Sequence, residues 1–367
     1  MKIIHVISSL IRGGRERQLA TIVSNTDLDR YPTKIIYFNK KKYSYIEKYG
    51  LHDKSIRLES RGKIPRLVEL HRILKREKPD VVYTWGNGES VSVLLLSPFH
   101  RYRFINGSIR HGIRAPKFSQ YLRTIVLHLS QHVVANSRAG LKANNLRRGK
   151  VLYNGIDGKF LVPVPEPVLT RQQLTGISPE VPLLISVANL VPYKDYFSVL
   201  KALKLLREAG HSFFYLILGD GPMYPSIIKT IEAFDLAWFV KVVGNVDNVD
   251  DYLKVSDIFI HSSKGEGCSN AILEAMASGL PIVASDTGGT GEIVKPENGA
   301  LFPYKSDNRL FELLNWLFNN PDVRIHMGQR SREKVRDEFS ITQMMQNYYS
   351  ILHSVNPQAH EKPLFVD

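Results

Sequence analysis

Short apolar runs alternate with amphipathic stretches along the first half of the chain. The runs cover residues 3–7, 35–37, 81–83, 104–105, 132–135 and 151–153. Within residues 67–74 and 118–129, apolar side chains recur every three or four positions, which predicts helices. Alternating strands and helices predict a parallel, doubly wound sheet with helices on both faces.

The same alternation restarts after a proline-rich stretch. Residues 160–174 hold Pro163, Pro165 and Pro167, a density that is typical of a linker. Apolar runs follow at 183–187, 214–218, 242–246, 258–260 and 282–284, and residues 306–355 have helical patterns. Because 367 residues supply material for two cores, we expect two α/β domains, residues 1–160 and residues 161–339.

Residues 255–292 combine an apolar run, a polar loop, a helix, a second apolar run and a glycine-rich loop. Glu266 lies in the first loop, and Glu274 lies about one turn into the helix if that helix starts near Asn270. Ser269 and Asn270 are good capping residues, and a helix start favours an anion. A phosphate bound there would bring sugar hydroxyls to both carboxylates.

The motifs of this stretch resemble those of glycosyltransferase family 4, which are retaining sugar-nucleotide transferases with the GT-B fold. The matching residues are Glu266 and Glu274 with seven residues between them, Glu274-Ala275-Met276-Ala277, Gly279-Leu280-Pro281 and Gly288-Gly289-Thr290-Gly291-Glu292. The resemblance implies two Rossmann-like domains that face a cleft. It also implies an acceptor-binding domain at 1–160, a donor-binding domain at 161–339, and a last helix, about 340–355, that packs back on the first domain.

The resemblance further assigns donor-binding residues. Glu266 would contact the hydroxyls of the donor sugar and act in catalysis, and Glu274 would contact the ribose. Lys194 matches a diphosphate-binding lysine, whereas Asn189 stands where the family has arginine. The other donor-binding residues that it implies are Gly13, Gly14, Gly244, Gly267, Cys268, Ser269 and Asn270.

Three residues of the first half are candidates for catalysis or acceptor binding. His111 lies at a strand end where family members carry a histidine close to the donor sugar, although a hydrogen-bonded loop histidine is nearly as common. Arg110 competes for the same role. Arg15 follows Gly13-Gly14 where the family has a small residue, which implies an anionic acceptor. Arg15 and Arg110 are therefore predicted acceptor-binding residues.

Positive charge is concentrated in the first half. Residues 1–160 hold 31 Lys+Arg and 11 Asp+Glu, whereas the remainder holds 18 and 24. This asymmetry favours an anionic partner over a merely solvated surface, and the candidates are nucleic acid, an anionic membrane surface and an anionic acceptor. We expect the basic first domain to make peripheral contact with an anionic membrane. Residues 38–50 are basic and aromatic, as in lipid-surface or nucleic-acid contacts, although a solvated loop fits them at least as well. Residues 91–103 place large apolar side chains beside Arg101 and Arg103. For residues 114–129 we favour core packing over an interfacial helix.

The sequence therefore predicts a retaining glycosyltransferase that moves a sugar from a nucleoside-diphosphate sugar, with UDP-sugars favoured, to a saccharide or a polyprenyl-diphosphate-linked acceptor. Surface polysaccharide assembly would suit such a reaction. We expect no metal cofactor and no nucleic-acid partner. We also expect a location in the cytoplasm or peripheral to the inner membrane face, because the single Cys268 fits a reducing compartment. A sugar-nucleotide epimerase and a basic nucleic-acid-binding protein remain alternatives.

Overall fold

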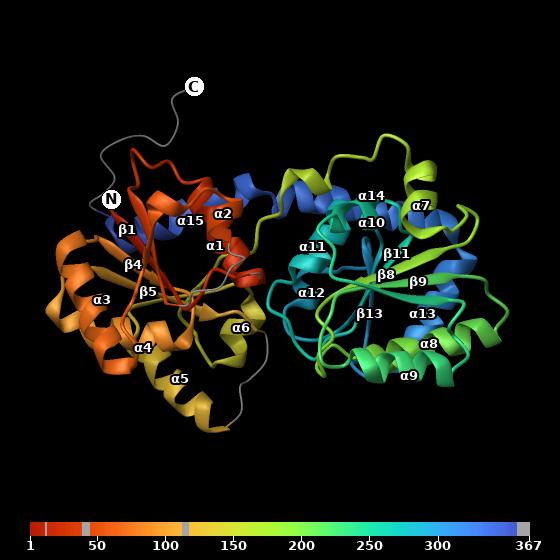
Figure 1. Cartoon of the computed structure of the whole chain (residues 1–367), viewed down its shortest axis with the longest axis horizontal. Coiled ribbons are helices and arrows are strands. Elements are labelled where there is room, and N and C mark those ends of the chain that lie inside the picture. Colours follow the sequence, from red (N-terminus) through yellow and green to blue (C-terminus); the bar gives the residue numbers. More distant parts are fainter. Residues whose placement is uncertain (12, 39–44, 112–116, 358–367) are drawn as a thin grey trace. The chain divides into compact units, whose positions relative to one another are not determined.

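The computed structural model describes residues 1–11, 13–38, 45–111 and 117–357, and it divides into two compact units (Figure 1). Unit 1 contains Met1–Gly155 and the chain from Ile341 onward, and unit 2 contains Ile156–Ser340. Each unit is a parallel sheet covered by helices. The predicted fold class, two doubly wound parallel sheets, is therefore confirmed.

Unit 1 is built on a seven-stranded sheet with the order β3-β2-β1-β4-β5-β6-β7. Its strands are β1 (Ile3–Ile7), β2 (Thr33–Tyr37), β3 (Ser55–Arg57), β4 (Val81–Thr84), β5 (Arg103–Ile109), β6 (His132–Ala135) and β7 (Lys150–Val151). The central strands are apolar on both faces because helices cover both: Ile3 and Ile4 face opposite sides, and both are fully buried.

The helices of unit 1 follow the strands as the alternation predicts. They are α1 (Gly14–Ser24), α2 (Tyr45–Lys48), α3 (Lys63–Glu77), α4 (Asn87–Leu96), α5 (Lys117–Leu129) and α6 (Arg138–Ala143), with the short 3-10 helices η1 (His52–Lys54) and η2 (Ser97–Phe99). The last helix, α15 (Ile341–Val355), joins the core of unit 1 through Met344, Tyr348 and Leu352. Gly155 makes this packing possible, since a Cβ there would come within 3.0 Å of the Met344 side chain.

Unit 2 is built on a six-stranded sheet with the order β10-β9-β8-β11-β12-β13. Its strands are β8 (Leu183–Val187), β9 (Phe214–Leu218), β10 (Val240–Gly244), β11 (Ile258–His261), β12 (Ile282–Ser285) and β13 (Gly299–Phe302). Its helices are η3 (Gly158–Phe160), α7 (Pro167–Thr175), α8 (Tyr196–Glu208), α9 (Tyr224–Ala233), α10 (Val249–Lys254), α11 (Asn270–Ala277), α12 (Thr290–Ile293), α13 (Asp307–Asn319) and α14 (Pro321–Glu338).

The proline-rich stretch 160–174 is not simply a linker, and that interpretation was wrong. Its second half forms α7, which begins at Pro167 and belongs to unit 2. Proline suits the first position of a helix, because the N–H that it lacks has no partner within the helix there. Arg171 anchors α7, since its guanidinium pairs with Asp257 at 2.9 Å.

The preference for core packing of residues 114–129 is confirmed for Leu127, but it is wrong for three other apolar side chains of the helix. In α5, Leu122, Ile125 and Leu129 are 56%, 39% and 62% exposed, whereas Leu127 is buried. The periodicity of this helix is real. However, a helix with apolar side chains on two faces does not reveal which face packs inward, and here Leu127 joins the core with Ile109 and Val133. Residues 114–116 lie outside the described residues, as do 39–44 of the basic segment 38–50.

Candidate functional site

The strand order of unit 2 reverses between β8 and β11, so the loops after these two strands border a crevice at the carboxyl edge of the sheet. The two loops are tied together, because the Lys264 N–H donates to the Tyr193 carbonyl at 2.9 Å. Crevices of this kind are where open α/β sheets bind ligands. Lys194 and Glu266 lie in these two loops. Both are predicted donor-binding residues, and they are 72 positions apart in the sequence.

Lys194 and Glu266 meet directly. The Lys194 ammonium donates to Glu266 Oε1, and its Nζ also lies 3.3 Å from Nε2 of His261. Ser263 Oγ lies 3.5 Å from the same Glu266 oxygen. The Lys194 side chain is only 10% exposed and that of Glu266 is 20% exposed. This pair presents a cation for phosphate and an anion for hydroxyl groups at one point.

His261, the last residue of β11, was not identified from the sequence. It is 3% exposed, and burial together with the Lys194 ammonium lowers its pKa to about 3. The imidazole is therefore neutral at physiological pH, and its Nε2 accepts from the Lys194 ammonium. Its position at the end of an apolar run, just before the polar loop, is the feature of the sequence that could have identified it.

The glycine-rich loop 288–291 positions Glu266 through the backbone. Gly289 N donates to the Glu266 carbonyl at 2.9 Å, and Glu266 and Gly288 form an isolated parallel bridge. Gly288 has a φ of 57°, which favours glycine. The loop before Glu266 is also fixed, since Ser285 Oγ accepts from the Ser263 N–H at 2.9 Å.

Helix α11 begins immediately after the Glu266 loop. Ser269 is its N-cap residue, but the Ser269 side chain makes no capping hydrogen bond, so the predicted capping role of this hydroxyl is wrong. The first amide groups of any helix have no partner within the helix itself. Glu274 lies in the second turn and is 5% exposed. Cys268 is buried beside the cap, and Gly267 and Asn270 flank it in sequence.

Asn189 and Gly244 lie at the ends of β8 and β10, the two strands that flank β9. Asn189 is exposed just after β8. Gly244 ends β10 with a φ of 87°, and its carbonyl accepts from Gly219 N at 2.8 Å. Gly219 permits a close approach, because a Cβ there would lie 2.0 Å from the Ala188 carbonyl oxygen. The turn after β9 therefore supports the loop that carries Asn189 and Lys194.

Three buried polar atoms at this edge lack hydrogen-bond partners among the described residues. They are Asp195 Oδ2, Ser262 Oγ and Thr290 Oγ1. Asp195 caps α8 through its other oxygen, at 3.3 Å from Ser198 N. An unsatisfied buried polar atom costs roughly 1–3 kcal/mol, so such atoms concentrated at a crevice point to a polar ligand.

Unit 1 repeats this arrangement at the carboxyl edge of its own sheet. The strand order reverses between β1 and β4, and Trp85 follows β4 in the crevice. Arg15 Nη1 donates to the Trp85 carbonyl at 3.3 Å, and the Arg110 guanidinium carbon lies 4.2 Å from the centroid of the Trp85 ring. The two predicted acceptor-binding arginines therefore converge on one tryptophan, which was missed from the sequence.

A buried hydrogen-bonded chain holds Trp85 in place. Trp85 Nε1 donates to His5 Nδ1 at 3.0 Å, and His5 Nε2 lies 3.0 Å from the Tyr348 hydroxyl. Burial lowers the pKa of His5 to about 3, so the ring is neutral. Since Nδ1 accepts, the proton is on Nε2, which donates to Tyr348. Helix α15 thus supports the crevice of unit 1 through Tyr348.

Each loop that borders this crevice is followed by a helix with a Gly N-cap and a glutamate three positions later. Gly13 and Gly86 are the N-caps, and a Cβ on either would come within 2.4 Å of a carboxylate oxygen of Glu16 or Glu89. Glycine therefore lets each carboxylate fold back over the helix start. Gly14 is the exposed first residue of α1. The Glu16 carboxylate pairs with Arg15 at 2.7 Å.

Glu89 is a candidate that the sequence analysis missed. It is 4% exposed, and its Oε1 has no hydrogen-bond partner among the described residues. Ser108 Oγ and Asn136 Oδ1, at the ends of β5 and β6, are likewise buried without a described partner. The three residues lie in the helix after β4, near the end of β5 and directly after β6, so the carboxyl edge of unit 1 also offers polar atoms to a ligand.

His111 is exposed directly after Arg110, and residues 112–116 beyond it lie outside the described residues. Its catalytic role stays a prediction. Within the described parts of the chain, no three His, Cys, Asp or Glu side chains are grouped as a metal site would require. No helix in those parts is both long enough and apolar enough to cross a bilayer.

Two Rossmann-like sheets, each with a polar crevice at a strand-order reversal, are the architecture of the GT-B fold class, which glycosyltransferases share. Residues 170–334 match the family described as Glycosyl transferases group 1. The matched residues lie entirely within unit 2, so the similarity to this family is a similarity of unit 2.

Similar proteins agree with this assignment. N-acetyl-alpha-D-glucosaminyl L-malate synthase of Bacillus anthracis is 25% identical over 276 residues, 75% of this chain and 68% of that protein. A GDP-mannose-dependent monoacylated alpha-(1-6)-phosphatidylinositol monomannoside mannosyltransferase of Corynebacterium glutamicum is 30% identical over 213 residues, so this chain spans only about half, 55%, of its length. The structure of Anabaena HepE in complex with UDP has a TM-score of 0.85 at 21% identity, covering 96% of this chain and 100% of that one.

Proposed function

We propose that the protein is a retaining glycosyltransferase that moves a sugar from a nucleoside-diphosphate sugar, with UDP-sugars favoured, to a phosphate-bearing saccharide or lipid-linked acceptor. The observation that carries the proposal is the contact of Lys194 with Glu266 and His261 in the unit 2 crevice. A sugar nucleotide has phosphates that need cations and hydroxyls that need acceptors. This crevice offers both.

Unit 2 holds the donor in this proposal. Lys194 and the amide groups at the start of α11 bind the diphosphate, because both supply positive charge. Glu266 accepts hydrogen bonds from the sugar hydroxyls and Glu274 from the ribose, while Gly244 lies near the base. UDP is favoured because the HepE structures contain UDP and UDP-glucose, although the mannosyltransferase relative names GDP-mannose.

The reaction forms a bond between an acceptor hydroxyl oxygen and the anomeric carbon, and it breaks the bond from that carbon to the diphosphate. The hydroxyl proton leaves with the departing diphosphate, and the new bond keeps the configuration of the old one. Negative charge grows on the leaving group. Lys194 stabilises it best if its ammonium already lies in place, as its pairing with Glu266 ensures. His111 would contribute a hydrogen bond to the sugar.

Unit 1 binds the acceptor in this proposal. Arg15 and Arg110 converge on Trp85 and suit an acceptor phosphate, while the Glu89 carboxylate suits a hydroxyl. A polyprenyl-diphosphate-linked sugar carries both groups. Such an acceptor would place the protein at the cytoplasmic face of a membrane, in surface polysaccharide assembly.

Calorimetric titration with UDP, GDP and ADP tests the proposal. One nucleotide should bind, and Lys194→Ala should weaken it at least tenfold, since hydrogen bonds to charged groups contribute about 1.5–3 kcal/mol. Lys201→Ala, on the exposed side of α8 in the same unit, is the matched control and should change nothing. Binding of no nucleotide would refute the donor site. Interconversion of a sugar nucleotide without any acceptor would instead indicate an epimerase.

A further inference from the structure

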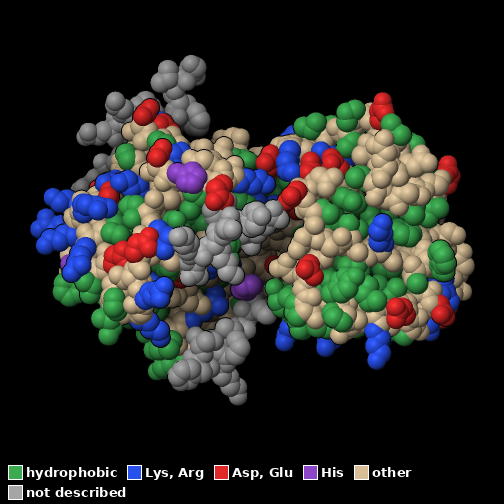
Figure 2. Space-filling model, viewed as in Figure 1, with side chains coloured by type: hydrophobic (Ala, Val, Ile, Leu, Met, Phe, Trp, Pro, Cys, Tyr) green, Lys and Arg blue, Asp and Glu red, His purple; other side chains and the backbone are tan. Residues whose placement is uncertain are grey.

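One segment of unit 1 carries positive charge with no compensating acid. Residues 90–156 contain 11 Lys+Arg and no Asp or Glu. The segment runs from the first turn of α4 to the end of the sheet. In Figure 2, the visible face of unit 1 has many more Lys and Arg side chains than that of unit 2. Arg110 belongs to this set, and its guanidinium lies over the Trp85 ring described above.

Several of these cations gather at the amino edge of the sheet, opposite to the crevice. Arg103, His132 and Lys150 are the first residues of the adjacent strands β5, β6 and β7. Burial and the neighbouring Arg103 and Lys150 lower the pKa of His132, which agrees with a positive environment. Arg101 precedes this row, and Arg147 and Arg148 lead into β7.

We call Arg101, Arg103, Arg147, Arg148 and Lys150 the basic edge. All five are exposed. Among the described residues, none of them pairs with a carboxylate, and Lys150 donates to the Ser354 hydroxyl. Exposed cations without acidic neighbours are available to an anionic partner.

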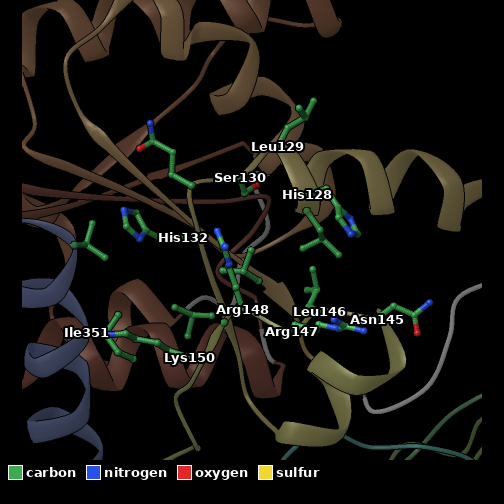
Figure 3. Close-up of a pocket in the computed structure, with 16 residues that line it drawn as sticks. His128, Leu129, Ser130, His132, Asn145, Leu146, Arg147, Arg148, Lys150 and Ile351 are labelled. Carbon is green, nitrogen blue, oxygen red and sulfur yellow. The ribbon is translucent and has the colours of Figure 1, made fainter.

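The basic edge surrounds a hollow. A cavity of about 680 Å³ lies between the end of α5, the start of β6, the loop before β7 and α15 (Figure 3). Arg147, Arg148, His132 and Lys150 line it together with apolar side chains. A second hollow of about 330 Å³ contains Arg101 and Arg103 and shares Leu129 with the first. Leu129 therefore lies where the two meet.

Exposed apolar side chains border this edge. Leu122, Ile125 and Leu129 form one face of α5, and the neighbouring α4 and η2 add Leu95 and Phe99, which are 58% and 72% exposed. We call these five the apolar stripe. Exposed apolar side chains on neighbouring elements, beside a cluster of cations, are characteristic of proteins that lie on membranes.

We propose that the basic edge and the apolar stripe dock unit 1 on an anionic membrane surface. The arginines pair with lipid phosphates, and Leu122, Leu129 and Phe99 reach the boundary between headgroups and acyl chains. A second copy of the chain fits this surface poorly, because it would set like charges opposite each other. A nucleic acid would use the cations but not the aliphatic side chains, since bases stack on aromatic groups.

Membrane docking rests on the proposed function only for its biological purpose, because vesicle binding can be measured whether or not the protein transfers a sugar. Helix α5 follows the carboxyl end of β5 and ends before the amino end of β6, so its 13 residues span the two edges, about 20 Å. A membrane that lies along α5 is therefore within about one helix length of the crevice. A lipid-linked acceptor could reach Arg15 and Arg110 without leaving the bilayer.

Co-sedimentation of the full chain with vesicles tests the proposal. The protein should bind vesicles that contain phosphatidylglycerol at low salt, and it should bind vesicles of phosphatidylcholine alone far more weakly. The variant R101Q/R103Q/R147Q/R148Q should lose affinity by about fivefold for each cation, or a few hundredfold in total. The matched control R61Q/K63Q/R72Q/K75Q removes the same charge from exposed positions at α3, and it should lose less than tenfold.

A second pair of variants tests the apolar stripe. Leu122→Ser with Leu129→Ser should abolish the binding that survives high salt, whereas Ile64→Ser with Val68→Ser, equally apolar and exposed on α3, should not. Equal losses in the two charge variants, no vesicle binding at low salt, or tight salt-dependent RNA binding would each overturn the proposal. Nucleotide titration of the same variants separates the two proposals, because UDP binding should stay unchanged in all four.

Discussion

Replacing Glu266 by glutamine gives the sharpest test of the donor site. Glutamine keeps the size of the side chain and one acceptor oxygen but loses the charge that holds Lys194. In the structure, one carboxylate oxygen takes the Lys194 ammonium and lies 3.5 Å from Ser263 Oγ. The substitution should therefore weaken binding of the donor sugar and release the Lys194 ammonium for the diphosphate.

The magnitude follows from the hydrogen bonds involved. A hydrogen bond to a charged group contributes about 1.5–3 kcal/mol, and losing the charge should weaken binding of the complete UDP-sugar by about 10- to 150-fold. Turnover should fall at least as much, because the sugar is no longer held for attack. The affinity for UDP alone should stay equal or rise a few-fold, since the Lys194 ammonium is released from its pair.

Calorimetry with UDP and with the UDP-sugar, followed by turnover measurements, would check both parts. Glu297→Gln is the matched control, because Glu297 is an exposed carboxylate of unit 2 that pairs with Lys334 at 3.5 Å. Near-normal turnover of the Glu266 variant would refute its assigned role. A parallel loss of UDP affinity would refute the assignment of Lys194 to the phosphate and of Glu266 to the sugar.

Three further predictions concern buried groups. His5 and His261, whose pKa values burial lowers to about 3, take up a proton only on unfolding, so stability should fall from pH 6.5 towards 3 by about 1.4 kcal/mol per pH unit for each. Urea unfolding between pH 7.5 and 5 should show this slope, and His261→Asn should flatten it in unit 2. An unchanged slope would contradict it. Tyr348→Phe leaves the His5 N–H unpaired and should cost about 1–3 kcal/mol in thermal unfolding, whereas Tyr349→Phe should cost less than half of that. Glu89→Gln should raise the KM for the acceptor without changing UDP affinity, and an altered UDP affinity instead would place Glu89 outside the acceptor site.

Much of unit 2 could be predicted because its chemistry is local in sequence. Glu266, the α11 helix and the Gly288-Gly289 loop fall within a single strand-loop-helix-strand-loop stretch, and the structure ties them together by one bridge and one hydrogen bond. Lys194 joins them only through the strand order, which places the loops after β8 and β11 side by side. His261 escaped notice because a histidine at the end of an apolar run has no periodicity of its own.

Unit 1 resisted prediction because its site is assembled from distant segments. Trp85 gathers Arg15 and Arg110 from loops 95 residues apart in sequence, and it is itself held by His5 and, through that ring, by Tyr348 of the last helix. No spacing along the chain reports such a contact. The pairing of β4 with β1 and with β5, together with the return of α15 to this unit, brings these side chains together.

The exposed apolar side chains of α5 show a different limit of what a sequence predicts. Hydrophobic periodicity states that a helix has an apolar face, but not whether protein or something else covers it. Here Leu127 packs inward while Leu122, Ile125 and Leu129 point outward, and α5 itself belongs to the segment 90–156, which lacks any acidic residue. A globular helix that served only the core would gain nothing from aliphatic side chains on its outer face. A helix that also lies on a lipid surface would gain from these side chains, because they would stabilise the membrane-bound state of the protein rather than its fold.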